Sequence, residues 1–579
     1  MKKLFIILFL IAAGITGLLF ISKLWINNIK KEDILDAFNK VITDGSDSLY
    51  SVKIGNYEIT GPFTGARIDN VVFEINQDVF LKMKAENTLP DIIMDGKVKS
   101  LVLEGVDIIQ LVGKNKDIRV KNIVLSGTEF NLYHYKKTKK DTSATTILTS
   151  LYDRIKKDFN SIQVGEISIL DGKMSYDPAG KLDKSNPFWK FDKIDIVLRD
   201  ILVDSASVYD TNRFLYARDF TSSISRFRGI MGNDLYTFGM DTCTYDFRTA
   251  SLDISGLRLS PHVSHEAFFR FKKFAVGEAT IELPSLKAFG FYVGQAILDG
   301  LITVDSVMIE RGRFGIYKDK SFGDPPVSKN GQYPNQLFLK LDASIHIPLI
   351  RIRNSSVVYT EKGLKTKKEG RVVFSDIYGS LSNITNIDSL IRRNPWSELT
   401  ARAVFLGKSP MDAHIALKLD DSSGTYEADA SLRNLDASQI NPVLRSLAQA
   451  EAKTFSLHNL SYKSKGNTES AIGSMKMNYS ALDLSLLSRD EETNKLEEKK
   501  WLSLLANAFK IRQENPQGPD EIKAANIVTQ RPYFRGFFAL IWFNIFDCMS
   551  EIAIKGDQPA ILTKNRKAEN LIRANQEHK

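Results

Sequence analysis

Residues 167–201 read ISILDGKMSYDPAGKLDKSNPFWKFDKIDIVLRDI, and the same pattern returns 183 positions later at residues 350–384. One offset aligns the two copies without a gap. The matching positions are Ile167 with Ile350, Ile169 with Ile352, Asp171-Gly172 with Asn354-Ser355, Met174 with Val357, Tyr176 with Tyr359, Phe191 with Phe374, Ile194 with Ile377, Leu198 with Leu381 and Ile201 with Ile384. The pattern predicts an internally repeated fold. The alternative is chance resemblance between ordinary amphipathic hairpins.

The first half of the repeat is typical of a hairpin with one apolar face. Ile167 and Ile169 alternate with other residues, which places both side chains on one face of a strand. The pair Asp171-Gly172 suits the positive φ angles of a tight turn, after which the alternation resumes. Two partial copies follow the same pattern: Ile123, Leu125, Gly127-Thr128, Phe130 and Leu132, and Val307, Ile309, Arg311-Gly312, Phe314 and Ile316.

The repetition predicts a mainly β fold. Every strand with an apolar face needs a partner for that face. We expect an elongated, curled antiparallel sheet that forms a repeated β-groove, with an N-terminal transmembrane helix, a few short amphipathic helices and a helical C-terminal region. Such a groove needs an apolar filling. Its candidate lining residues are Ile167, Ile169, Met174, Tyr176, Ile194, Leu198, Ile350, Ile352, Val357, Tyr359, Ile377 and Leu381.

Composition excludes several classes of protein. The chain has 579 residues, 43% hydrophobic and 25% charged, which is an ordinary folded composition and too long for one compact domain. The net charge of +9 comes mostly from scattered Lys and Arg, without an aromatic-plus-basic nucleic-acid signature, so no nucleic-acid partner is expected. The two cysteines, Cys243 and Cys548, form no CxxC motif, and the sequence leaves open whether they pair.

The N-terminus predicts a membrane anchor. Residues 4–22 carry no charge and nearly reach the length that crosses a bilayer core. A cleaved signal peptide is the alternative, but its apolar core is usually shorter and ends in small residues. We expect residues 1–24 to be the anchor and residues 25–48 to form a juxtamembrane amphipathic helix. The membrane contacts expected here are Leu4, Phe5, Leu18, Phe20 and Trp25.

Three further regions follow the anchor. Residues 49–323 and 324–490 are predicted to be the first and second parts of the groove, and residues 491–579 a helical tail. A charged amphipathic helix is expected over residues 495–512, and a capped helix at about residues 438–450. The aromatic segment 534–546 is too short to span a bilayer. It suits either an interfacial or re-entrant element, with Phe537, Phe538, Trp542 and Phe543 in contact with the membrane, or a helix that plugs one end of the β structure.

Catalytic motifs are absent from the sequence. His262 and His265 lack the HExxH pattern, and no phosphate loop or G-x-S-x-G elbow is present. We therefore expect neither an enzyme nor a metal site nor a cofactor. An enzyme with unrecognised chemistry is the remaining alternative.

Several of these features together resemble AsmA-type envelope proteins. They are the single N-terminal span, the recurring units, the stretch Asn434-Leu435-Asp436-Ala437-Ser438-Gln439-Ile440-Asn441-Pro442, and Ala471-Ile472-Gly473-Ser474-Met475. The resemblance covers most of residues 1–490 as pattern more than identity. It implies a bacterial inner-membrane anchor with the bulk of the chain in the periplasm. It also implies kinship with TamB-like and chorein-type bridge proteins, whose β-groove carries phospholipid. Residues 516–579 depart from this pattern.

The expected function is binding or conduction of phospholipid along an apolar groove between membranes, in support of outer-membrane homeostasis. The expected partners are membrane lipids, the inner membrane, and outer-membrane or envelope proteins. Burial stabilises an acyl chain by about 0.8 kcal/mol per CH₂, so an apolar groove lowers the cost of moving lipid through water without any catalytic residue. The alternative is a structural or assembly factor of the envelope that carries no lipid.

Overall fold

The computed structural model describes residues 43, 46–60, 64–90, 92–107, 117–134, 152, 156, 160–177, 189–210, 212–231, 234–364, 366–489, 496–498, 511–518 and 524–554. This part of the chain is mainly β, with 61% of residues in strands and 16% helical. The chain divides into two compact units. Unit 1 comprises Met1–Asn233, Thr237–Gly256 and Lys287–Thr303, and unit 2 comprises Asp234–Tyr236, Leu257–Leu286 and Val304–Lys579.

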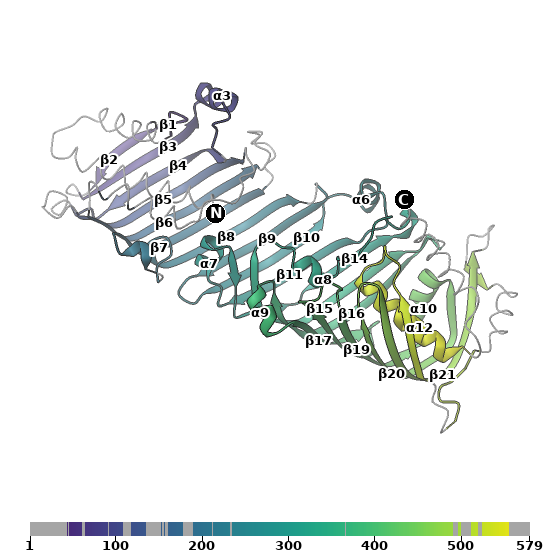
Figure 1. The fold of residues 1–579 in the computed structure, drawn as a ribbon. Coiled ribbons are helices and arrows are strands. Elements are labelled where there is room, and N and C mark those ends of the chain that lie inside the picture. Colours follow the sequence, from purple (N-terminus) through teal and green to yellow (C-terminus); the bar gives the residue numbers. More distant parts are fainter. Residues whose placement is uncertain are drawn as a thin grey trace. The chain divides into compact units, whose positions relative to one another are not determined.

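Unit 1 is built on a sheet of long strands (Figure 1). Strands β1 and β2 both pair with β3, and the ladder then runs through β4, β5, β6 and β7 to β8. The bounds are β1 (Tyr50–Lys53), β2 (Asn56–Thr60), β3 (Gly65–Ile75), β4 (Ile92–Glu104), β5 (Asp117–His134), β6 (Ser161–Asp177), β7 (Trp189–Val203) and β8 (Ala217–Met231). Unit 1 also holds most of β9 (Tyr236–Asp246) and all of β12 (Leu301–Thr303), whereas β10 (Ser251–Pro261) is divided between the units and most of β11 (Glu278–Phe289) belongs to unit 2.

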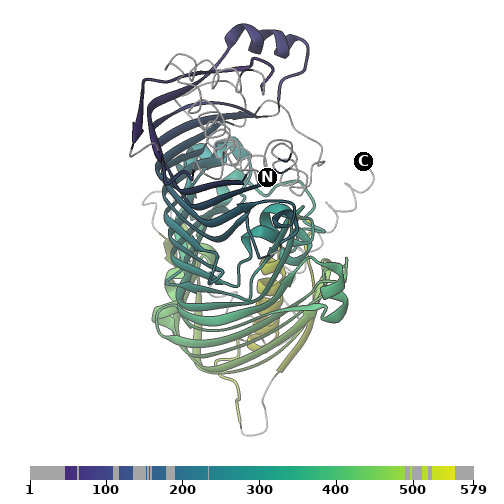
Figure 2. The same ribbon diagram turned by 90° about the vertical axis from the view of Figure 1, so that its left-hand side faces the viewer.

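Unit 2 contains a second ladder, which runs from β15 through β16, β17, β18, β19 and β20 to β21, and then to β23. Its strands curl around one helix, α12 (Figure 2). The bounds are β13 (Ser306–Glu310), β14 (Arg313–Asp319), β15 (Ser344–Lys362), β16 (Glu369–Thr385), β17 (Trp396–Phe405), β18 (Ser409–Lys418), β19 (Tyr426–Asp436), β20 (Ala450–Gly466), β21 (Ser470–Arg489), β22 (Leu496–Glu498) and β23 (Ala524–Gln530).

The predicted hairpin turn inside the repeat is wrong. β6 and β15 each continue through the position of the expected turn, which holds a β-bulge. Asp171 and Asn354 take the left-handed conformation there, with φ of 53° and 47°. A bulge and a tight turn both need residues that tolerate positive φ, so the local sequence does not separate them. The strands are therefore longer than the short hairpins that we expected.

The structure confirms the internal repeat, because both copies pair in the same register. The second half of each copy is the antiparallel neighbour of the first half. Equivalent pairs are Ile167 with Leu198 and Ile350 with Leu381, Gly172 with Ile194 and Ser355 with Ile377, and Met174 with Phe191 and Val357 with Phe374. One copy lies in each unit, and each contains bulges at the same places.

The partial copies lie directly beside the full copies, in parallel. Ile123 of β5 pairs with Ile167 of β6, and Val307 of β13 pairs with Ile350 of β15. Our prediction of an antiparallel sheet is therefore wrong at three pairings, β5–β6, β13–β15 and β14–β15, which are parallel. A parallel pair needs a long crossover connection, and residues 135–160 and 320–343 provide one in each repeat.

Helices make up a smaller share of the described residues than strands do. The α-helices are α3 (Gln77–Ala85), α6 (His265–Lys272), α7 (Val293–Leu298), α8 (Pro334–Phe338), α9 (Asp388–Arg393), α10 (Ala437–Val443) and α12 (Phe537–Ala553). Two 3₁₀ helices, Ser207–Tyr209 and Lys320–Phe322, and a π-helix, Leu444–Ala448, are also present. The capped helix predicted near residue 438 is confirmed as α10. Its capping box joins the side chain of Asp436 to the backbone N–H of Gln439, and the side chain of Gln439 to the backbone N–H of Asp436, both at 3.1 Å.

The predicted tail is described only in part, and the predicted anchor, residues 1–24, lies outside the described residues. β22 and β23 occupy part of the tail predicted to be helical, and β22 lies within the helix expected over residues 495–512. Among the helices of the described ranges, none combines the length and apolar character needed to cross a membrane. The predicted span at residues 4–22 lies outside those ranges, as do its contacts Leu4, Phe5, Leu18, Phe20 and Trp25.

Candidate functional site

In unit 1, six of the predicted lining residues share one face of the sheet. Ile167 lies opposite Leu198 and beside Ile123, and Ile169 lies beside Leu125. Ile167, Ile169 and Leu198 are buried in a large apolar cluster, at 1%, 6% and 1% exposed. Met174, Tyr176 and Ile194 are only partly buried. Half of these six residues are therefore already covered within the unit.

The six equivalent residues of unit 2 also share one face, and all six are partly exposed. They are Ile350, Ile352, Val357 and Tyr359 on β15, and Ile377 and Leu381 on β16. We call this face the inner face, because α12 packs on the same side of the sheet. The repeat thus presents the same apolar positions twice: three of the six are buried in unit 1, whereas all six are partly exposed in unit 2.

Small residues form a row across the inner face. Ile352 pairs with Gly379, and successive strands then place Ala401, Ala413 and Ala430 side by side. Larger apolar residues flank this row, among them Leu381, Leu399 and Ile415 in the neighbouring row. The row therefore has smaller side chains than its neighbours on β16 to β19. The sequence patterns did not single out this row, because its four small residues lie on four different strands.

Helix α12 covers the far end of the inner face. Cys548 and Ile552, both fully buried, pack with Met475, Met477 and Tyr479 of β21. The absent side chain of Gly473 makes room for this approach, since a Cβ there would lie 1.7 Å from the Oδ1 atom of Asn544.

A buried polar network fixes the helix on the strands. The hydroxyl of Tyr462 donates to Oδ1 of Asn544 at 2.7 Å, and Nδ2 of Asn544 donates to the hydroxyl of Thr529 at 3.0 Å. Thr529 in turn donates to Asp547. Burial raises the pKa of Tyr462, so its hydroxyl keeps the proton that it donates. The network positions α12 without leaving these groups unpaired.

The aromatic side chains of segment 534–546 lie on two sides of α12, one buried and one exposed. Phe537 is 5% exposed, with its ring centroid 5.0 Å from those of both Tyr333 and Tyr426. Phe538 and Trp542 are 65% and 53% exposed, and Phe543 is partly exposed. One side of the segment is thus part of the core, as expected for a helix that plugs the β structure. The other side is free to contact a ligand or a membrane.

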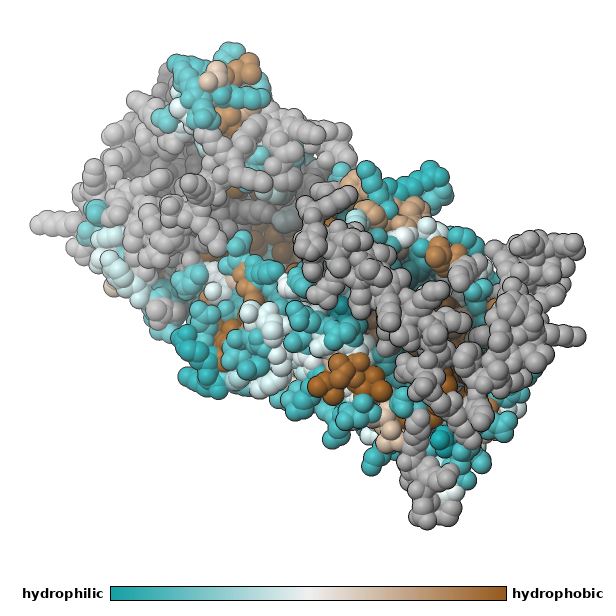
Figure 3. Space-filling view, turned by 45° about the vertical axis from the view of Figure 1, so that its right-hand side comes forward, coloured by the Kyte–Doolittle hydropathy of each residue, from teal (hydrophilic) through white to brown (hydrophobic). Residues whose placement is uncertain are grey.

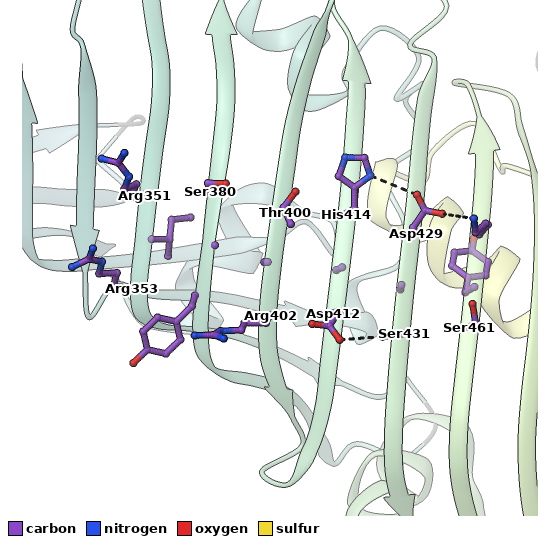
Figure 4. Close-up of a pocket in the computed structure, with 18 residues that line it drawn as sticks. Arg351, Arg353, Ser380, Thr400, Arg402, Asp412, His414, Asp429, Ser431 and Ser461 are labelled. Carbon is purple, nitrogen blue, oxygen red and sulfur yellow. Dashed lines mark hydrogen bonds and ion pairs between the residues drawn. The ribbon is translucent and has the colours of Figure 1, made fainter.

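The opposite, outer face of the same strands is polar. Thr400 and Arg402 alternate with the inward Ala401, and their neighbours across the sheet include His414 and Asp429 (Figure 4). These side chains line an open cavity of about 720 Å³. Asp429 lies 3.5 Å from Nδ1 of His414 and forms an exposed ion pair with Lys463 at 3.9 Å. This arrangement is typical of a solvated sheet face.

Polar and apolar surfaces are also separated in the space-filling view. Apolar residues gather in patches and hollows, whereas hydrophilic residues cover most of the surrounding surface (Figure 3). Within the described residues, no group of three or more His, Cys, Asp or Glu side chains is placed to hold a metal ion. Cys243 and Cys548 are both free, and burial raises the pKa of the Cys548 thiol to about 11.

The chain matches no protein-family model, and a search of curated proteins finds no match either.

Proposed function

We propose that the protein binds the acyl chains of phospholipids on the inner face of unit 2. One observation carries the proposal: Ile350, Ile352, Val357, Ile377 and Leu381 lie on one face, and all remain partly exposed. Each buried CH₂ of a ligand contributes about 0.8 kcal/mol, so the attraction grows with the length of acyl chain that this face covers. The row Gly379–Ala401–Ala413–Ala430 offers a path for such a chain.

The wider proposal is conduction of phospholipid between membranes by a protein anchored in the bacterial inner membrane, with its bulk in the periplasm. Supporting features are the uncharged residues 4–22, the repeated apolar face, and the resemblance to AsmA-type proteins. No enzymatic step and no cofactor is part of this proposal.

The experiment compares two neighbouring positions on β17. Ala401→Asp places a carboxylate on the inner face, whereas Thr400→Asp places one on the outer face. Full-length protein is purified from membranes, and bound phospholipid per chain is measured by mass spectrometry. We expect lipid in the wild type and in Thr400→Asp, and at least a severalfold loss in Ala401→Asp. Folded wild-type protein without lipid, or equal lipid in both variants, would overturn the proposal.

A scaffold that carries no lipid is the second candidate, and unit 1 favours it. Ile167, Ile169 and Leu198 are sealed in a core, so this copy of the repeat stabilises the fold by packing. A folded, lipid-free wild type in the experiment above would select this candidate.

A further inference from the structure

One end of the inner face changes abruptly from apolar to charged residues. On β14, Phe314, Ile316 and Lys318 point to the same side as their partners Val357, Tyr359 and Glu361 on β15. Ile316 is 43% exposed, so an open apolar surface leads directly to the charges. Along both strands the order is apolar, apolar, charged, which is the polarity of an amphiphile such as a lipid.

Five charged side chains form this end, and we call them the Lys318 cluster. Three are cations, Lys318, Lys320 and Arg535, and two are carboxylates, Asp324 and Glu361, which leaves one excess positive charge. All five side chains are between 17% and 28% exposed. Such partly buried charges are screened by water and salt much less than surface charges.

The cations of the cluster retain free hydrogen-bond donors. Both lysine ammonium groups lie 3.7 Å from Asp324, and Lys320 lies 3.9 Å from Glu361, which is longer than a hydrogen bond. Arg535 donates its two terminal nitrogens to Asp324 at 3.0 Å and 2.9 Å, while its buried Nε atom has no partner among the described residues. The carboxyl of Glu361 is already engaged by the hydroxyl of Tyr359.

The excess positive charge of the cluster also affects the pKa of Lys318. Burial, together with the nearby charges of Lys320 and Arg535, lowers the pKa of Lys318 to about 8, despite the opposing effect of Asp324 and Glu361. A bound anion would relieve this repulsion and satisfy the free donors.

We propose that the Lys318 cluster binds the anionic phosphate headgroup of a lipid whose acyl chains lie on the adjacent apolar surface. The inference rests on the lipid-binding function proposed above and adds a preference for anionic over zwitterionic phospholipid. Its basis is the juxtaposition of a cation-rich, partly buried cluster with the exposed apolar side chain of Ile316 on one face of β14 and β15.

The test measures which lipid the full-length protein takes up. Protein is incubated with vesicles that contain equal amounts of phosphatidylglycerol and phosphatidylcholine, then re-isolated, and both lipids are quantified by mass spectrometry. The wild type should be enriched in phosphatidylglycerol, and the enrichment should persist at high salt. In Lys318→Met/Lys320→Met the enrichment should fall about tenfold, the size expected for lost charge-assisted contacts.

Two further variants control this result. Lys463→Met/Lys465→Met removes the same charge from the outer face, where both lysines are about three-quarters exposed, and should leave the enrichment unchanged. Glu361→Gln raises the excess positive charge and should increase the enrichment, which a merely damaged fold would not do. Circular dichroism checks that every variant is folded.

Each contrary outcome overturns a distinct statement. Wild-type protein that takes up neither lipid overturns the proposed lipid-binding function itself. Uptake of both lipids without enrichment, or enrichment unchanged in Lys318→Met/Lys320→Met, overturns only the headgroup site. Binding of inorganic phosphate to the protein without enrichment of phosphatidylglycerol identifies a site for free phosphate and overturns the lipid headgroup.

Discussion

Leu198 and Leu381 occupy the same position in the two copies of the repeat, and their truncation should have unequal costs. Leu198 is 1% exposed within the core of unit 1, whereas Leu381 is partly exposed on the inner face of unit 2. Leu198→Ala should lower the free energy of unfolding by about 3 kcal/mol, the usual cost of lost burial plus a cavity. Leu381→Ala should cost about 1 kcal/mol, because part of its side chain is already in water and no closed cavity forms.

Native-state hydrogen exchange measures this difference, because it assigns the loss of protection to individual strands. In Leu198→Ala the loss should appear in β6 and β7, and in Leu381→Ala a smaller loss should appear in β15 and β16. The paired registers of the two copies make the backbone surroundings of the two leucines comparable. Equal losses of about 3 kcal/mol in both variants would show that the inner face is sealed, and would refute the contrast between the units.

Two further predictions concern unit 2. Burial lowers the pKa of Lys318 from the ordinary value of 10.5 to about 8. Between these two pH values the unfolded chain therefore holds a proton on Lys318 that the folded chain has released. The stability of the wild type relative to Lys318→Met should therefore rise as the pH increases through this window, by about 1–2 kcal/mol after allowance for partial exposure. Denaturant titrations at several pH values measure this stability difference. A difference that does not change with pH would contradict the prediction. Asn544→Ala should cost about 1–3 kcal/mol because it removes the acceptor of the buried Tyr462 hydroxyl and the donor to Thr529. Trp542→Ala, on the exposed side of α12, should change stability by less than about 0.5 kcal/mol in the same assay.

Periodicity in the sequence was sufficient to predict the β class, the repeat and the sidedness of its residues. Alternation with period two places Ile167 and Ile169 on one face whatever the strands do next. The match at a fixed offset between Leu198 and Leu381 likewise predicted equivalent positions. In the structure their cross-strand partners are the equivalent residues Ile167 and Ile350. The start of α10 was predictable because its capping box is local.

Two interpretations failed because they depended on partners distant in sequence. Asp171-Gly172 suits a turn or a bulge equally well, and only the neighbouring strand decides between them. The parallel pairing of β5 with β6 was likewise invisible, since a strand's sequence does not state the direction of its neighbour.

The sequence by itself determined which side chains are apolar and on which face of a strand they lie, because alternation is a property of the extended backbone. Only the tertiary structure decided how far each apolar face is covered, so that Leu198 is buried while Leu381 is partly exposed. It also decided that Lys318, Asp324 and Arg535 meet at the end of the inner face. Burial and charge clustering are sums over segments far apart in the chain, and no local pattern encodes them.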